Sequence, residues 1–207
     1  GGGNVAVGAT SGDALNTGAD NVSIGTDALS AGTTVQRAVV IGKDACSSGV
    51  MITNSGGSVP SYADGTISIG FSALAALTTG AGNVAIGYQA ATDITTGTKN
   101  IAIGYQALVS ADGGESNNIA IGWQALGTLE NDSATHNVAI GNLALDATST
   151  YVATFNVAVG HTAGTAVTSG DNNTMIGHAA GENITTGGSN TVLGYDAQVG
   201  AAGATNQ

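Results

Sequence analysis

One eight-residue phrase recurs along the whole chain. It reads Asn-Val-Ala-Ile-Gly-Tyr-Gln-Ala at 83–90 and Asn-Ile-Ala-Ile-Gly-Tyr-Gln-Ala at 100–107, 17 residues later. Its glycine, called the repeat glycine below, stands at Gly8, Gly25, Gly42, Gly70, Gly87, Gly104, Gly122, Gly141, Gly160, Gly177 and Gly194. The steps are 17–19 residues, with one of 28. A short period sustained from end to end predicts a solenoid of about 11 rungs, forming one domain over residues 1–207.

The composition favours β-structure with a core of small side chains. The chain has 34 glycines and a single proline among 207 residues, which suits tight turns between strands. Charged residues make up 8% and aromatic residues 4%, so the chain is neither a charge-rich disordered segment nor one with a large aromatic core. No helical period is visible. We therefore expect an all-β, parallel solenoid.

Charge and cysteine content exclude several classes of partner. Fourteen acids against three basic residues leave a net charge of −11, which disfavours nucleic acid and anionic lipid. Cys46 is the single cysteine, so neither a disulfide framework nor a cysteine metal site is expected. No run of 18 apolar residues predicts membrane insertion. The chain begins Gly-Gly-Gly without Met, and we expect it to be a processed or partial chain.

Each rung is expected to begin with a short strand. Val84 and Ile86 lie two residues apart and are predicted to share an apolar inner face, with Ala85 on the other face. Gly87 then bends the chain or lets a neighbouring backbone approach closely. Ala90 recurs in 10 of 11 rungs, three residues after the repeat glycine, which predicts a buried position with room only for a methyl group.

A second strand is expected in the same rung. Ile94 recurs as Leu15, Leu77, Val167 and Ile184, and it is predicted to face inward from this strand. A Thr-Thr-Gly turn at 95–97 follows. Each rung is therefore predicted to contain two strands of four or five residues.

An asparagine opens most rungs, four residues before the repeat glycine. These residues are Asn4, Asn21, Asn83, Asn100, Asn118, Asn137, Asn156, Asn173 and Asn190. Stacked one rung apart, their side-chain amides are predicted to form a hydrogen-bonded ladder. A ligand-binding row of amides is the alternative.

Extra residues interrupt the period in a few places. The 28-residue step predicts an inserted loop within 46–65, which contains the only proline, Pro60. Smaller insertions lengthen the connections at 112–116, 131–135 and 148–153. Insertions in solenoids lie along one edge, which is often the binding edge.

The narrow rung favours assembly with other copies. No polar cap is recognisable before the first phrase, at 4–8, or after the last one, at 190–194. More of the same polypeptide or another subunit is expected to cover these open strands. Association around a threefold axis would also bury outward-facing alanine and isoleucine side chains.

The phrase Asn-Val-Ala-Ile-Gly-x-x-Ala resembles the head repeat of trimeric autotransporter adhesins. The form Asn-Ile-Ala-Ile-Gly-Tyr-Gln-Ala-Leu at 100–108, with Thr-Thr-Gly connections, is similar to repeats in bacteriophage tail fibres. The resemblance covers nearly the whole chain. It implies a left-handed parallel β-solenoid, a parallel homotrimer, an extracellular place on a virion or cell surface, and attachment to a host surface.

No arrangement of residues predicts an enzyme, a cofactor or a metal site. No Ser–His–Asp or Cys–His pattern keeps the period. His161 and His178 follow repeat glycines and should stack, so they could bind a transition metal, but exposed polar stacking is the preferred interpretation. Asp27, Asp44 and Asp196 share a position, yet the calcium-binding nonapeptide is absent, and we interpret them as solvated.

The candidate ligand site is a column of aromatic residues one position after the repeat glycine, with glutamines beside it. Its members are Phe71, Tyr88, Gln89, Tyr105, Gln106, Trp123 and Gln124. One interpretation is a ladder that stabilises successive rungs or fills an interchain groove. The other is a platform for a cell-surface glycan.

Three functions are considered. The favoured one is a structural and adhesive fibre segment of a phage tail fibre or bacterial adhesin. The alternative is a homopolymeric extracellular filament of solenoids stacked end to end. An ice-binding solenoid is disfavoured because Thr78 and Thr79 are adjacent and face opposite ways, which makes no flat threonine array.

Overall fold

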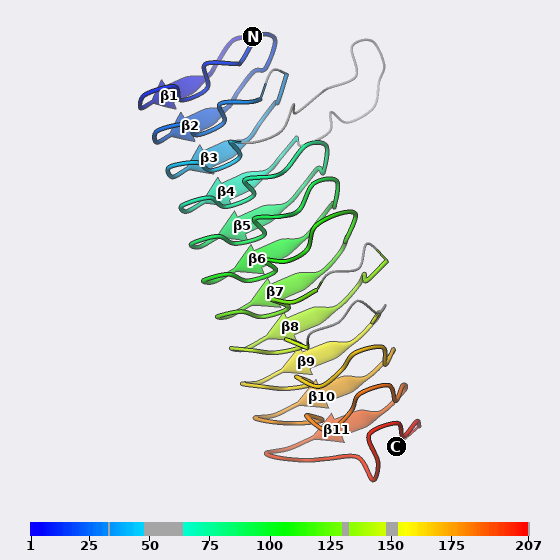
Figure 1. Cartoon of the computed structure of the whole chain (residues 1–207). Coiled ribbons are helices and arrows are strands. Elements are labelled where there is room, and N and C mark those ends of the chain that lie inside the picture. The colour runs from blue at the N-terminus through cyan, green and yellow to red at the C-terminus, as the bar shows by residue number, and fades with distance from the viewer. Residues whose placement is uncertain (33, 48–63, 130–132, 148–152, 207) are drawn as a thin grey trace.

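The computed structural model describes residues 1–32, 34–47, 64–129, 133–147 and 153–206. In these ranges the chain is a parallel β-solenoid without helices (Figure 1). Eleven strands stack in chain order into one sheet: β1 (Val5–Val7), β2 (Val22–Ile24), β3 (Val39–Ile41), β4 (Ile67–Ile69), β5 (Val84–Ile86), β6 (Ile101–Ile103), β7 (Ile119–Ile121), β8 (Val138–Ile140), β9 (Val157–Val159), β10 (Thr174–Ile176) and β11 (Thr191–Leu193). The predicted fold class is confirmed.

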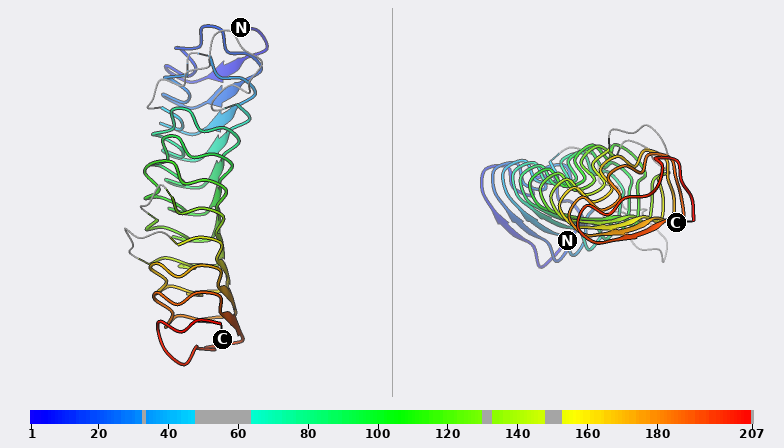
Figure 2. Two further views of the ribbon diagram at one scale, coloured as in Figure 1. Left: turned by 90° about the vertical axis from the view of Figure 1, so that its right-hand side faces the viewer. Right: turned by 90° about the horizontal axis from the view of Figure 1, so that it is seen from below.

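The repeat sets the register of the sheet. Val84 pairs with Ile101, and Ile86 pairs with Ile103, so residues at the same place in the phrase lie side by side. The same pairing joins β3 to β4, although 28 residues separate these strands. The strands line one long side of the stack, while the connections form the other sides (Figure 2). Each sequence position therefore becomes a straight column of side chains along the sheet.

The strand orientation expected from the sequence is wrong. Ala85 is fully buried, whereas Val84 is half-buried and Ile86 is exposed. In β2–β11 the middle residue is buried and the first and third residues are half-buried or exposed; the middle residue is Ala or Ser in seven of these ten strands. The alternation of side chains along a strand correctly places Val84 and Ile86 on the same face. In this strand the narrow interior holds the smaller Ala85 side chain.

The expected second strand is also absent, and each observed strand has three residues rather than four or five. Ile94 is fully buried, as predicted, but it follows a turn at 88–93 and belongs to no strand. Gln89 and Ala91 adopt left-handed φ values of 53° and 50°, which fold the chain back instead of extending it. Hydrogen bonds between rungs persist, as from the Ala91 N–H to the Ala107 carbonyl at 2.9 Å.

The interior is filled by the middle strand residues and by the residues four positions after the repeat glycine. Leu74 and Leu108 occupy the latter position in the rungs of Ser68 and Ala102, and all four residues are fully buried; in the rung of Ala85 the position is Ala91, also buried. The strand β10 instead contributes Met175, and the two positions equivalent to those leucines near it are Gly164 and Gly181. A Cβ at either glycine would lie within 2.8 Å of the Met175 side chain. The large Met175 side chain thus occupies space that a side chain at these two positions would need.

The repeat glycine is required for two reasons. Gly87 has a φ of 142°, and a Cβ built there would lie 2.3 Å from the carbonyl oxygen of Gly104 in the next rung. Ala90 is fully buried, as are its equivalents from Ala28 to Ala180, which confirms the predicted methyl-sized position. The inserted loop lies mostly at 48–63, outside the described residues, but the sheet continues on both sides of it.

Candidate functional site: the aromatic column beside the sheet

The predicted aromatic residues lie in one exposed column beside strands β4–β7. Phe71, Tyr88, Tyr105 and Trp123 are 39%, 43%, 48% and 44% exposed. Each follows a repeat glycine that ends a strand, so the in-register pairing of the strands places these residues one rung apart. The structure therefore places the four predicted aromatic residues in one column, and ring stacking joins Phe71, Tyr88 and Tyr105.

The aromatic rings are turned toward one another along the stack. The ring centroids of Phe71 and Tyr88 are 5.3 Å apart with an interplanar angle of 13°, and those of Tyr88 and Tyr105 are 5.1 Å apart at 8°. The Lys43 ammonium lies 5.5 Å from the Phe71 ring centroid and makes a cation–π contact with this ring. Since the faces of Tyr88 are covered on both sides, this ring presents its edge to a ligand.

This geometry limits how a glycan could bind. A sugar ring that packs on an aromatic side chain needs an open face, and the column offers mainly ring edges and phenol hydroxyls. Stacking of rings on adjacent strands stabilises the sheet. The glycan platform therefore stays a prediction, while the ladder has direct geometric support.

The glutamines beside the column bind one another. Gln106 donates from Nε2 to Oε1 of Gln89 at 2.9 Å, and Gln124 donates from Nε2 to Oε1 of Gln106 at 3.4 Å. All three residues have left-handed backbone conformations, with φ between 50° and 53°. Their amides form a second ladder parallel to the rings, so each retains only part of its hydrogen-bonding capacity for a ligand.

The asparagine ladder predicted from the sequence is present and buried. Asn100 donates from Nδ2 to Oδ1 of Asn83 at 3.2 Å and to the Glu115 carbonyl at 2.7 Å, and its own Oδ1 accepts the Asn118 N–H at 3.0 Å. The same pattern recurs at Asn137, which is 1% exposed. These amides are fully used inside the fold, so they do not form a ligand-binding row.

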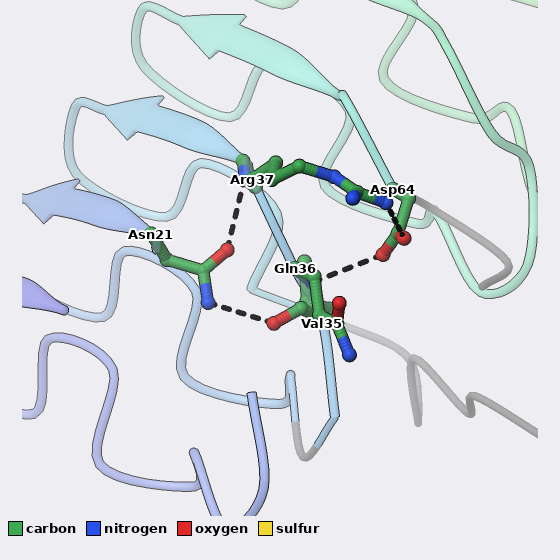
Figure 3. Close-up of polar contacts among 6 residues, drawn as sticks. Asn21, Val35, Gln36, Arg37 and Asp64 are labelled. Atoms are coloured by element: carbon green, nitrogen blue, oxygen red, sulfur yellow. Dashed lines mark hydrogen bonds and ion pairs between the residues drawn. The ribbon is translucent and has the colours of Figure 1, made fainter. Parts of the chain in front are cut away.

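Two rungs lack the asparagine, and one of them is supported differently. Ala38 donates its N–H to Oδ1 of Asn21 at 2.9 Å but has no amide to continue the ladder. Beside it, the carboxylate of Asp64 accepts the Gln36 N–H at 3.0 Å and pairs with the Arg37 guanidinium at 2.6 Å (Figure 3). The Asp64 side chain is 6% exposed. This buried carboxylate was missed by the sequence reading because Asp64 lies at the end of the insertion, outside the repeat.

The histidines form two separate stacks. His161 lies on His178 with centroids 5.2 Å apart, as predicted, and His178 lies on Tyr195 at 5.1 Å. His136 stacks on Phe155 at 5.0 Å in another column, directly before the asparagine position. That second column was missed, although both residues share the same place relative to Asn137 and Asn156 in the sequence.

The remaining polar groups that the structure describes offer no reactive arrangement. Burial raises the pKa of the Cys46 thiol to about 12, which leaves it protonated and unreactive at neutral pH. Asp27 accepts a hydrogen bond from the Thr10 hydroxyl, and Asp44 pairs with the Lys43 ammonium. Among the described residues, no three or more His, Cys, Asp or Glu side chains converge as they would around a metal ion.

Comparisons with known proteins add no assignment. No protein-family model, curated protein or solved structure matches the chain. The part of the chain that the structure describes also contains no helix long and apolar enough to cross a membrane.

Proposed function

We propose that this chain is a structural and adhesive segment of an extracellular fibre, on a phage tail fibre or a bacterial surface, in which three parallel copies lie side by side. The observation that carries this proposal is the apolar outer face of the sheet. Of the 22 outward side chains at the first and third positions of β1–β11, 20 are Val, Ile or Leu and two are Thr. Ile24, Ile86, Ile140 and Ile176 are 36–39% exposed in the single chain.

A surface of this kind favours a partner. Soluble monomers rarely expose large contiguous apolar patches, and such patches mark interaction sites. This one is straight, uncharged and repeats once per rung. Another copy of the same sheet has the same repeat and the same chemistry, so it can match every rung in turn. The resemblance to trimeric fibre repeats favours three copies.

The dimensions indicate how much of the surface a partner would cover. Ten strand-to-strand steps of ~4.8 Å and three residues of ~3.3 Å give a face of roughly 480 Å². A stable interface needs about 800 Å² from each partner. Widening the contact by two residues, to include the column of Tyr88 and Tyr105, reaches roughly that value. We therefore infer that a neighbouring copy covers part of the aromatic column.

Assembly is tested by the mass of the chain in solution at micromolar concentration, measured by light scattering. We expect a trimer for the unmodified chain. Introducing Ile86→Asp and Ile103→Asp together should yield monomers, because two carboxylates on adjacent rungs cannot be desolvated between copies. Thr96→Asp, on an exposed connection, is the matched control and should remain trimeric. A monomeric unmodified chain would overturn the assembly.

Adhesion is tested by binding of the labelled chain to bacterial cells. If Tyr88→Ala with Tyr105→Ala abolishes binding without changing the melting temperature, the column contacts the receptor. If these changes lower the melting temperature or dissociate the trimer, the column belongs to the interface, which is the result we expect. Absence of binding to any cell or glycan tested would contradict the adhesive part of the proposal. Electron micrographs showing the 207-residue unit repeated along a filament would favour the filament instead.

A further inference from the structure

Two histidines are held side by side at the carboxyl ends of β9 and β10. His161 and His178 occupy the same rung position, and their imidazole rings are parallel within 9° with centroids 5.2 Å apart. Both side chains are exposed. Tyr195 extends the stack by one rung below His178. In the single chain the two imidazoles are therefore neighbours on the surface, and a metal site here requires that the neighbouring copy of the proposed fibre leave this end of the column open.

Hydrogen bonds between rungs fix the backbone beneath both rings. The His161 carbonyl accepts the Ala179 N–H at 2.9 Å, and the His178 carbonyl accepts the Asp196 N–H at 2.8 Å. The preceding strand residues Val159 and Ile176 are paired in register. The backbone at both histidines is therefore fixed, and only the side-chain torsions remain free. Folding has already met the entropic cost of bringing the two imidazoles close together.

A shared metal ion would require both rings to leave the stack. Imidazole nitrogens bind first-row transition metals at ~2.0–2.1 Å, so two of them on one ion lie at most about 4.2 Å apart. The 5.2 Å separation is between ring centroids, and the nitrogen lone pairs lie in the ring planes, which are parallel within 9°. Both exposed side chains must therefore rotate until one nitrogen of each points at the same ion, and the broad Cβ–Cγ torsion of histidine allows this rotation. Binding then exchanges the ring stack for two metal–nitrogen bonds.

The electrostatic setting favours a cation. Beyond Lys99 the sequence contains eight acids and no Lys or Arg, so this half of the solenoid carries uncompensated negative charge. A field of this sign raises the local concentration of cations. It acts on every cation equally, and the imidazole pair supplies the selectivity for a transition metal.

We propose that His161 and His178 bind one divalent transition metal ion, each through one ring nitrogen, with water completing the coordination. The sequence alone predicted no metal because it offered no third protein ligand in this column, and the described residues contain no three-ligand cluster. A two-imidazole site needs none. Cu²⁺ should bind more tightly than Ni²⁺ or Zn²⁺, following the general order of affinities for nitrogen ligands.

The test is calorimetric titration of the whole chain with CuCl₂ at pH 7.5, repeated with NiCl₂. We expect one ion per chain. His161→Asn and His178→Asn should each weaken binding by about 100-fold, because one ligand loses the advantage of a linked pair. Asparagine is a suitable replacement, since Asn142 occupies the equivalent position one rung before His161.

Two controls separate the pair from a general affinity of imidazole for metal. His136→Asn removes the remaining histidine, which stacks on Phe155 rather than on another imidazole, and it should leave Cu²⁺ affinity unchanged. Tyr195→Phe keeps the stacked ring but removes the hydroxyl, and it should also have no effect. The proposal is overturned if the chain binds no Cu²⁺, if either pair variant retains affinity within about twofold, or if His136→Asn weakens binding as much as they do. Unchanged melting temperatures confirm that each variant is folded.

Discussion

Replacing one buried amide of the asparagine ladder should destabilise the whole solenoid. In Asn100→Ala, the Glu115 carbonyl and the Asn118 N–H lose side-chain partners that now lie at 2.7 and 3.0 Å. The bond to Asn83 Oδ1 is lost as well. Leaving a buried polar group without its partner costs about 1–3 kcal/mol, so two such groups predict a loss of about 2–6 kcal/mol. We expect about 4 kcal/mol, a large share of the stability of a domain of this size.

Urea unfolding followed by circular dichroism, at one protein concentration, measures this loss. The matched control is Asn4→Ala, which removes an amide of the same column that donates to the Gly18 carbonyl at 2.9 Å. Asn4 itself is exposed, but its Oδ1 also accepts the N–H and the Nδ2 of the buried Asn21 at 3.0 Å. Because water can reach this exposed end of the ladder, the expected cost is about 1–3 kcal/mol, smaller than at Asn100. Equal losses at the two sites, or a loss under about 1 kcal/mol at Asn100, would refute the reasoning that burial makes the ladder energetically important.

Three further predictions concern other positions of the repeat. Thr66→Asn should raise the unfolding free energy by about 1 kcal/mol or more, because the asparagine continues the ladder and removes a buried hydroxyl without a partner. Denaturant titration measures this change, and a loss of stability would contradict the ladder geometry. Burial raises the pKa of the Cys46 thiol from about 9 to about 12, so thiol ionisation should not affect the unfolding free energy below pH 9. Between pH 9 and pH 12 the unfolding free energy should fall by up to about 1.4 kcal/mol per pH unit, since only the unfolded thiol ionises there. Cys46→Ala should remove that slope. Gly87→Ala should cost at least about 2 kcal/mol, because its Cβ would clash with the Gly104 carbonyl, whereas Gly200→Ala, with open space around it, should be nearly neutral in thermal melts.

Much of the architecture could be predicted from residues that recur with the period. The repeat glycine, the methyl-sized position at Ala90 and the amide ladder through Asn100 all follow from one argument. In a parallel stack, each rung must repeat the same contacts with the rung before it, so a residue type required at one rung is required at the next. The stacking of His161 on His178 could be predicted for the same reason.

Features that depend on the shape of a single rung could not be predicted in this way. Alternation shows that Val84 and Ile86 face the same side, but not which side is the interior. Similarly, Ile94 is buried whether its segment is a strand or a turn, and only the left-handed backbone at Gln89 distinguishes the two. Left-handed glutamine has no strong sequence signal, because the energetic cost is met by hydrogen bonds to the neighbouring rung.

The sequence by itself therefore determined that this chain is a parallel β-solenoid, how its strands pair and which side chains share a column. The tertiary structure alone decided which columns face outward, and so which surface is available to a partner. The physical reason is that the period specifies contacts between rungs, which are local and repeated. The inside and outside of a rung are instead decided by packing across a narrow core, where Ala85 is buried and Ile86 is exposed. The same packing decision leaves the apolar sheet face exposed.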